Sequence, residues 1–140
     1  MLTEKDYCDY DTCVALKELG FPQDYIFARY AEVDKWVDYT SHKKGDLIIS
    51  EDRFAFTLED ESIVAPLLYE AQKWLREENG IEIVVLSKGM VGSPYYSQVY
   101  TEDYAIGGDE EYSTYEEALL GGIKEAVKIF EGGVIWEEVY

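Results

Sequence analysis

Few residues of this chain are of the types that do chemistry. His42 is the only histidine among the 140 residues, and it stands in a polar segment beside Lys43 and Lys44. A Ser-His-Asp triad and a histidine-based metal site both need an imidazole with matched partners. A single histidine followed by two lysines in a polar segment is typical of an exposed turn, so we expect neither kind of site.

Carboxylates are the abundant reactive groups, because 30 Asp and Glu stand against 12 Lys and Arg and the formal net charge is −18. Asp9 with Asp11, or the run 109–111, could hold a hard cation, but neither has the ladder of oxygen ligands and the central glycine of an EF-hand loop. Acid–base catalysis needs a carboxylate with a raised pKa in a dry pocket, which a sequence does not reveal. We predict no catalytic residue, no cofactor and no metal site. The alternative left open is a small hydrolase that uses Asp or Glu with a metal.

The charge also limits the class of partner. A surface this acidic repels phosphate backbones and anionic lipids, so we expect binding to neither nucleic acid nor membrane. The first residues lack the basic start and apolar core of a signal peptide, and no apolar run approaches the roughly 18 to 20 residues that span a bilayer. We expect a cytoplasmic protein in which Cys8 and Cys13 are free thiols, at least one of them buried.

Tyrosines supply the candidate binding surface. Four of them fall on both faces of one predicted hairpin, and an acidic run follows the hairpin. Exposed tyrosine is enriched in protein interfaces. The alternative is a sheet with one face buried and the other half exposed, in which the phenols only pack against neighbours. The candidate interaction surface comprises Tyr95, Tyr96, Tyr100, Tyr104, Asp109, Glu110 and Glu111.

Local patterns predict the elements of the first half of the chain. Apolar residues at helical spacing over 9–19, followed by Gly20, predict a short helix. Alternating aromatic and β-branched residues over 25–40 predict two strands, and 41–45 reads as a polar turn. The segments 46–50 and 53–57 are typical of a hairpin. The acidic stretch 59–62 then leads into a second helix, with Pro66 in its first turn and its end at Asn79 and Gly80.

The second half has clearer signals. The β-branched run 81–86 predicts a strand near the centre of the sheet, 95–101 predicts an aromatic strand, and a third short strand is expected around 104–106. Thr114 and Glu117 form a capping box that starts the last helix, which ends at Gly132 and Gly133. Gly122, between small residues on the same helix face, predicts a close approach to a sheet. The tail after Gly132 could add an edge strand or dock on a partner.

This order of elements predicts an α+β fold: a single domain over 1–140, with an antiparallel sheet and about three helices packed on it. The C-terminal half reads helix, strand, strand, a third short strand, helix. That order resembles the double-stranded-RNA-binding domain. The family presents Lys and Arg at the start of its final helix, whereas Glu116 and Glu117 stand there in this chain, so we do not expect RNA binding.

A more specific resemblance covers nearly the whole chain. It rests on YDTCVALKELGF at 10–21, AP at 65–66 before YEAQKWLRE at 69–77, and YSTYEEAL at 112–119. These segments resemble a family of small uncharacterised proteins carried by prophages and mobile elements of Bacteroides-type bacteria. The middle, from Tyr25 to Glu61, and the tail after Gly132 match that pattern poorly. The resemblance implies a stand-alone cytosolic protein and brings no catalytic residues.

Together these features predict a non-enzymatic accessory or interaction protein of a phage or mobile element. It is expected to bind a basic or neutral host or phage protein. A sharper version is mimicry, in which spaced carboxylates imitate the phosphates of a nucleic acid. The alternative is that the charge only keeps the protein soluble. A homodimer is also compatible with the sequence.

Overall fold

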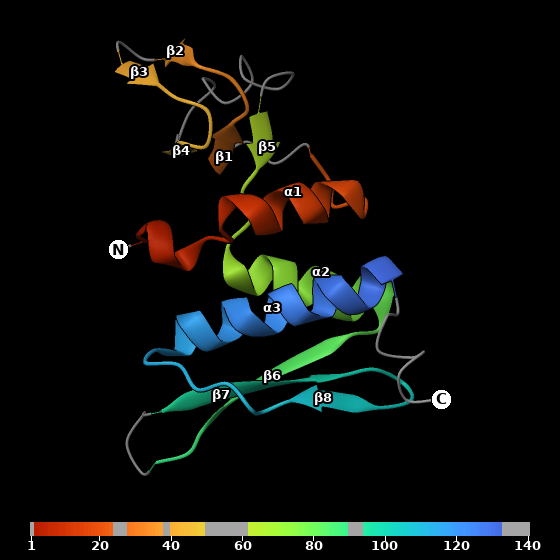
Figure 1. Cartoon of the computed structure of the whole chain (residues 1–140). Helices are drawn as coiled ribbons and strands as arrows, with labels where there is room; N and C mark the ends of the chain where they lie inside the picture. Colours follow the sequence, from red (N-terminus) through yellow and green to blue (C-terminus); the bar gives the residue numbers. More distant parts are fainter. Residues whose placement is uncertain (1, 24–27, 38–39, 50–61, 90–93, 133–140) are drawn as a thin grey trace. The chain divides into compact units, whose positions relative to one another are not determined.

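The computed structural model describes residues 2–23, 28–37, 40–49, 62–89 and 94–132 (Figure 1). Its elements in chain order are η1 (Glu4–Asp6), α1 (Tyr10–Glu18), β1 (Ala28–Ala31), β2 (Lys35–Val37), β3 (Thr40–His42), β4 (Leu47–Ile49), β5 (Ser62–Val64), α2 (Leu68–Asn79), β6 (Glu82–Ser87), β7 (Tyr95–Tyr100), β8 (Ala105–Gly107) and α3 (Tyr115–Gly132). Every pairing between these strands is antiparallel. The predicted α+β class is confirmed.

The chain divides into two compact units, each described by itself below. The N-terminal unit is Tyr7–Leu67, and the C-terminal unit is Met1–Asp6 with Leu68–Tyr140. The single domain over 1–140 stays a prediction. The predicted hairpin partner at 53–57 and the tail after Gly132 lie outside the described residues.

Helix α1 has the ends that local chemistry predicts. The side chain of Asp9 accepts the Thr12 N–H at 3.0 Å, which satisfies a free donor of the first turn. At the other end Gly20 has a φ of 101°, and the Phe21 N–H donates to the Leu16 carbonyl at 2.9 Å. These are the bonds of a Schellman motif, in which glycine adopts the left-handed conformation without strain.

The main sheet of the N-terminal unit has the order β4-β1-β5, and all four residues of the central strand β1 are buried. One of them is Arg29, only 2% exposed, whose Nε donates to the Ser62 hydroxyl. Its Nη1 donates to the Gln23 carbonyl at 3.1 Å. A buried guanidinium needs such partners, because an unpaired buried charge costs several kcal/mol, of order 3 to 5. Strand β5 supplies one of them.

Three predictions for this unit are wrong at their boundaries. Ser41 and His42 belong to β3, which pairs with β2, so the polar turn starts later than predicted. Ser62 does not lead into a helix but starts the buried strand β5, because it pairs with β1 at Ala31. Pro66 precedes α2 instead of lying in its first turn, and its carbonyl accepts the Cys8 N–H at 3.0 Å.

The sheet of the C-terminal unit has the order β6-β7-β8, and α2 and α3 lie on one of its faces (Figure 1). The prediction that the first of these strands lies near the centre is wrong for the described strands, because β7 is central among them and β6 is at an edge. Both faces of β6 carry apolar residues. The helices bury one face, and the apolar residues of the other face give the strand the composition of a central strand. The edge is covered in part by Gln72 of α2, whose side-chain N–H donates to the Ile83 carbonyl at 2.9 Å.

Helix α3 confirms two predictions. Thr114 Oγ1 accepts the Glu117 N–H at 3.1 Å and donates its own hydroxyl to the Glu117 carboxylate at 3.0 Å, so the helix starts at the predicted cap. At Gly122 a methyl group would lie 2.5 Å from Cγ2 of Ile83 and 3.1 Å from Oγ of Ser97. The helix therefore approaches the sheet as closely as only glycine allows.

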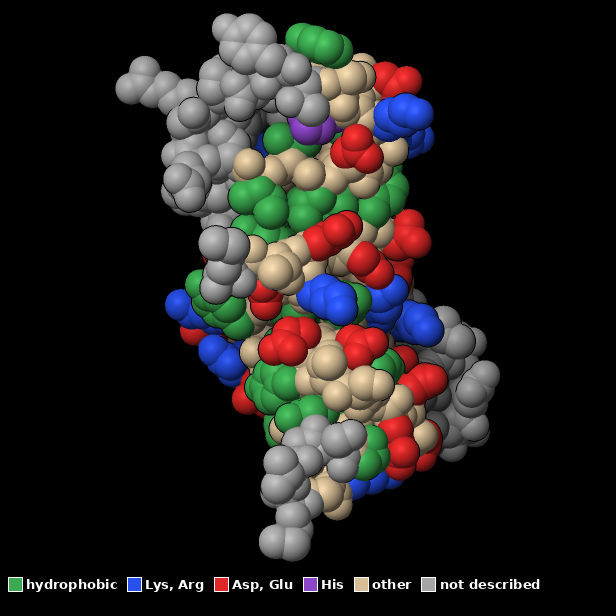
Figure 2. All heavy atoms as spheres, turned by 90° about the vertical axis from the view of Figure 1, so that its left-hand side faces the viewer, with side chains coloured by type: hydrophobic (Ala, Val, Ile, Leu, Met, Phe, Trp, Pro, Cys, Tyr) green, Lys and Arg blue, Asp and Glu red, His purple; other side chains and the backbone are tan. Residues whose placement is uncertain are grey.

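Charged side chains of both signs share the surface seen in Figure 2. On this face Asp and Glu stand among Lys, Arg and apolar side chains, and do not form one continuous acidic area. On this face the carboxylates, which exceed the cations in the sequence, are thus interspersed with other groups. The charge acts there as a general negative potential more than as a single anionic patch.

Candidate functional site

The predicted interaction surface is divided between the two faces of the C-terminal sheet. Successive residues of a strand point to opposite faces, so Tyr95 and Tyr96 of β7 diverge. Tyr95 contacts the Tyr115 ring of α3 edge to face, with centroids 6.1 Å apart. It therefore lies on the helix side. Tyr96 and Tyr100 lie on the opposite face.

We call that opposite face the open face, because within the C-terminal unit no described helix covers it. The strand register places on it Val84 and Leu86 of β6, Tyr96, Gln98 and Tyr100 of β7, and Ala105 of β8. Leu86 and Tyr100 are each 38% exposed. The Tyr100 hydroxyl donates to Gln98, which fixes the phenol on the sheet surface. The open face is thus an aliphatic and aromatic surface with few polar groups.

Charged residues border the open face. Lys88 lies 5.2 Å from the centre of the Tyr96 ring and 2.9 Å from the carboxylate of Glu111. Glu111 raises the pKa of Lys88, so the ammonium stays charged at neutral pH. At the β6 edge Glu82 lies 3.7 Å from Arg76. Exposed Glu102 and Asp103 follow β7 in the turn to β8. The border of this face is therefore mostly acidic.

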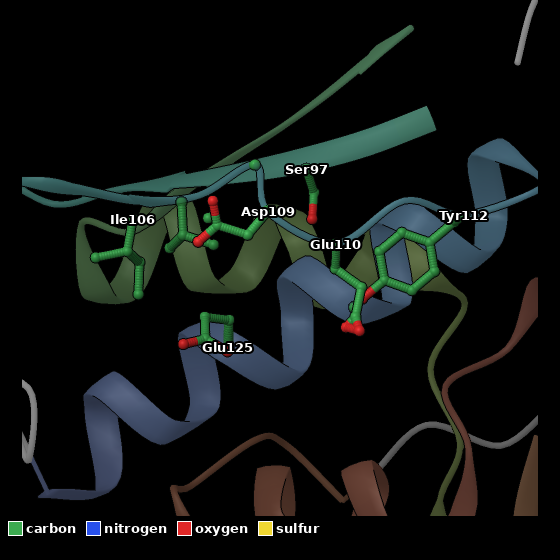
Figure 3. Close-up of a pocket in the computed structure, with 10 residues that line it drawn as sticks. Ser97, Ile106, Asp109, Glu110, Tyr112 and Glu125 are labelled. Carbon is green, nitrogen blue, oxygen red and sulfur yellow. The ribbon is translucent and has the colours of Figure 1, made fainter. Parts of the chain in front are cut away.

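On the helix side the chain forms a cleft of about 330 Å³ between β7, β8 and α3 (Figure 3). The predicted Asp109 and Glu110 line it from the loop after β8, whereas the predicted Glu111 pairs with Lys88 elsewhere. We call this the acidic cleft, and its polar lining is Ser97, Asp109, Glu110, Tyr112 and Glu125. Val99, Ile106 and three glycines complete its walls.

Local structure explains why this cleft exists. Gly107 has a φ of 104°, and a methyl group on it would lie 2.7 Å from the Ser97 carbonyl, so the chain turns tightly against β7. Two backbone hydrogen bonds between Tyr95 and Tyr112, of 2.8 and 2.9 Å, then tie the acidic loop to the same strand. The Tyr112 ring lies against Gly121, where a methyl group would be 2.6 Å from its Cζ. Small residues thus leave space that side chains would otherwise fill.

The negative charge of the cleft shifts the pKa of nearby tyrosines. Burial raises the pKa of Tyr112, and the carboxylates of Glu110 and Glu125 raise it further, while Lys124 acts in the opposite direction. Burial also raises the pKa of Tyr104, with a smaller contribution from Asp103 and Glu125. Both phenols therefore stay protonated and can act as hydrogen-bond donors at neutral pH.

The thiols are placed as predicted. Cys8 and Cys13 are both free and both buried. A hydrogen bond with Cys8 and burial both raise the pKa of Cys13 well above its usual range. A thiol must be ionised to act as a nucleophile, so Cys13 is unsuited to covalent catalysis.

Sequence reasoning missed three residues of the acidic cleft. Ser97 lies in a predicted strand, but its face depends on which neighbour it pairs with. Glu125 follows Gly121 by four residues and so shares a helix face with it, which was a readable signal. Tyr112 was assigned to a loop, where nothing indicated that it would turn towards α3. Each comes from a different segment of the chain.

Over the part of the chain that the structure describes, no three His, Cys, Asp or Glu side chains are grouped so that they could hold a metal ion. No helix among these residues is both long enough and apolar enough to cross a bilayer. Comparison with protein-family models, with curated proteins and with solved structures found no match to this chain. The resemblance to prophage proteins stays a prediction.

Proposed function

We propose that this protein is a non-enzymatic accessory protein of a phage or mobile element, and that it acts in the cytoplasm by binding another protein through the open face. The observation that carries this proposal is the apolar and aromatic surface of β6 and β7 on the side away from α2 and α3. Such a surface is normally covered in a folded protein, because leaving it in water forgoes roughly 25 cal/mol per Å².

The charges around the open face define the chemistry of the partner. Its border carries Glu82, Glu102 and Asp103 in excess over Arg76 and Lys88. Val84 and Gln98 lie at its middle, and the exposed Leu86 and Tyr100 lie towards its two ends. A matching partner has an apolar centre surrounded by Lys and Arg. A second copy of the chain would bring the same acidic border, so charge repulsion disfavours a homodimer in this arrangement. The partner we propose is a basic host or phage protein.

Mimicry of nucleic acid is the alternative use of the same charge. It requires carboxylates spaced as an anionic surface, and the face in Figure 2 intersperses them with lysine, arginine and apolar groups. The open face gains its contact area from apolar side chains instead. A competition experiment with DNA separates the two. DNA displaces a mimic from its partner. DNA displaces a protein that binds through the open face only if the partner's DNA-binding site overlaps the surface that contacts the open face.

Site-specific photo-crosslinking tests the proposal. A photoreactive residue replaces Leu86 on the open face, or Tyr69 on α2 as the control. Tyr69 is an aromatic that is 61% exposed on the same unit. After irradiation in lysate of infected bacteria, the adduct formed from position 86 is identified and the partner is purified. We expect a specific adduct from position 86 and none from position 69.

The affinity of the purified partner for variants of the protein then tests whether the open face is the binding surface. Tyr100→Ala should weaken binding by about tenfold or more, as truncation of an aromatic that is buried in an interface does, whereas Tyr69→Ala should leave it unchanged. Binding should also weaken as salt is raised, because the complementary charges are screened. Equal adducts from both positions, or an unchanged affinity of the Tyr100→Ala variant, would show that the open face is not the binding surface.

A further inference from the structure

The acidic cleft lies on the other side of the sheet from the open face and is independent of it. Its strand residues Ser97 and Val99 alternate with Gln98 and Tyr100 of the open face along β7. Its remaining lining comes from the loop after β8 and from α3. A cleft of about 330 Å³ is at the small end of the roughly 300 to 1,000 Å³ that is usual for ligand pockets. It suits one small group.

The polar groups that line the cleft favour a cationic ligand. Figure 3 shows Asp109, Glu110 and Glu125 around the space between β7 and α3. No lysine or arginine is among the described residues that line it. A carboxylate at neutral pH only accepts hydrogen bonds, so these groups fit a ligand that donates them.

A second observation at the same place points to a ligand. Ser97 is only 8% exposed, and among the described residues its hydroxyl has no hydrogen-bond partner. In Figure 3 this hydroxyl points from β7 into the space beside Glu110. The oxygen itself is reachable from the cleft, so it can accept a hydrogen bond from a donor bound there.

The arrangement selects the kind of cation. Among the described residues, these carboxylates are not grouped as the ligands of a metal ion. An ammonium group has three donors that spread in different directions, and the acceptors here come from three different segments. Val99 and Ile106 offer an apolar wall for the carbon chain that carries such a group.

We propose that the acidic cleft binds a primary alkylammonium group, attracted by the carboxylates of Glu110, Glu125 and Asp109 and with the Ser97 hydroxyl as a hydrogen-bond acceptor. Two sources share this chemistry: a free aliphatic diamine, and a lysine side chain of a peptide or protein. The apolar wall accepts the methylene chain of either. The chemistry recognised is the same, and only the binding experiment separates the sources.

Titration of the full-length protein tests this proposal. The probes are cadaverine and the capped tripeptide acetyl-Gly-Lys-Gly-amide, and binding is followed by calorimetry and by NMR shifts of the Ser97 and Gly121 amides. Tetramethylammonium at equal ionic strength is the control ligand, because it carries the same single charge as the tripeptide without N–H donors. We expect saturable binding of at least one probe and none of tetramethylammonium.

Matched variants locate the site. Glu125→Gln, Glu110→Gln and Ser97→Ala should each weaken binding by about threefold to tenfold, the usual range for a charge-assisted hydrogen bond that is partly solvated. Glu116→Gln is the control, because it removes the same charge from an exposed position in the first turn of α3. Ser97→Ala changes no charge and so separates hydrogen bonding from general attraction.

Absence of saturation with both probes would overturn the proposal. Equal binding of tetramethylammonium, or equal weakening by Glu116→Gln and Glu125→Gln, would also overturn it, because the cleft would then be only part of a general negative potential.

Discussion

Replacing Gly122 by alanine tests the packing of α3 on the sheet, on which both the acidic cleft and the open face depend. The added methyl group would lie 2.5 Å from Cγ2 of Ile83 and 3.2 Å from Cβ of Ser97. Carbon atoms in contact are normally about 3.5 to 4.0 Å apart. All three residues are buried, so the overlap is relieved only if the helix moves away from the strands.

The magnitude follows from two opposing terms. Alanine in place of glycine inside a helix gains about 1 kcal/mol from backbone entropy. Overpacking a well-filled interior costs about 1 to 3 kcal/mol, and we take about 2 to 3 here because the contacting atoms belong to fixed strands. The net expectation is a loss of about 1 to 2 kcal/mol in the free energy of unfolding. A surface helix would instead gain stability.

Urea unfolding followed by circular dichroism measures this difference. Ile83→Ala removes the atom that the new methyl group meets, and alone it should cost about 2 to 5 kcal/mol. In that background Gly122→Ala should lose most of its penalty, because only the looser contacts of 3.1 and 3.2 Å with Ser97 remain. The coupling between the two sites is then the overlap itself. The reasoning is refuted if Gly122→Ala is as stable as the wild type, or if its cost is the same in both backgrounds.

Three further predictions concern the described residues. The pKa of Tyr112 is raised in the folded state, so its contribution to stability is present below the ordinary pKa of about 10 and is lost as pH rises through the folded pKa. Stability should therefore fall less steeply with rising pH in the Tyr112→Phe variant. The difference in phenolate absorbance between the two proteins should appear only above the ordinary pKa of tyrosine. Thr114→Ala should lower the free energy of unfolding by about 1 kcal/mol through loss of the cap, whereas Ser113→Ala should not. Cys8 and Cys13 should react with a disulfide reagent only after unfolding, and rapid reaction of the native protein would contradict their burial.

Features set by neighbouring residues were predictable from the sequence. The start of α1 at Asp9 and of α3 at Thr114 depends on one side chain and a backbone N–H three residues later. Helix α1 ends at Gly20 and α2 ends at Gly80, and each of these ends depends on a single positive φ. The close approach at Gly122 was also readable, because small residues recur on one helix face. These interactions are local, so little else in the chain changes them.

Strand placement was less predictable. The run 81–86 has the composition of a central strand, yet β6 lies at an edge among the strands that the structure describes, because alternation along the chain does not say how many neighbours a strand has. Strand β5 was missed because its stability comes from β1 and from the buried Arg29, more than thirty residues earlier in the chain. Composition describes a strand's surroundings only when both faces and both edges are known.

The sequence alone determined the sign of the charge, the helix ends and the presence of most described strands, since each follows from composition or from residues a few positions apart. Only the tertiary structure decided which tyrosines share a face, and it sent Glu111 to Lys88 while turning Glu110 into the acidic cleft. Ser97, Tyr112 and Glu125 meet there because strand register and helix docking bring distant segments together. Those long-range pairings are cooperative properties of the fold, which no local pattern encodes.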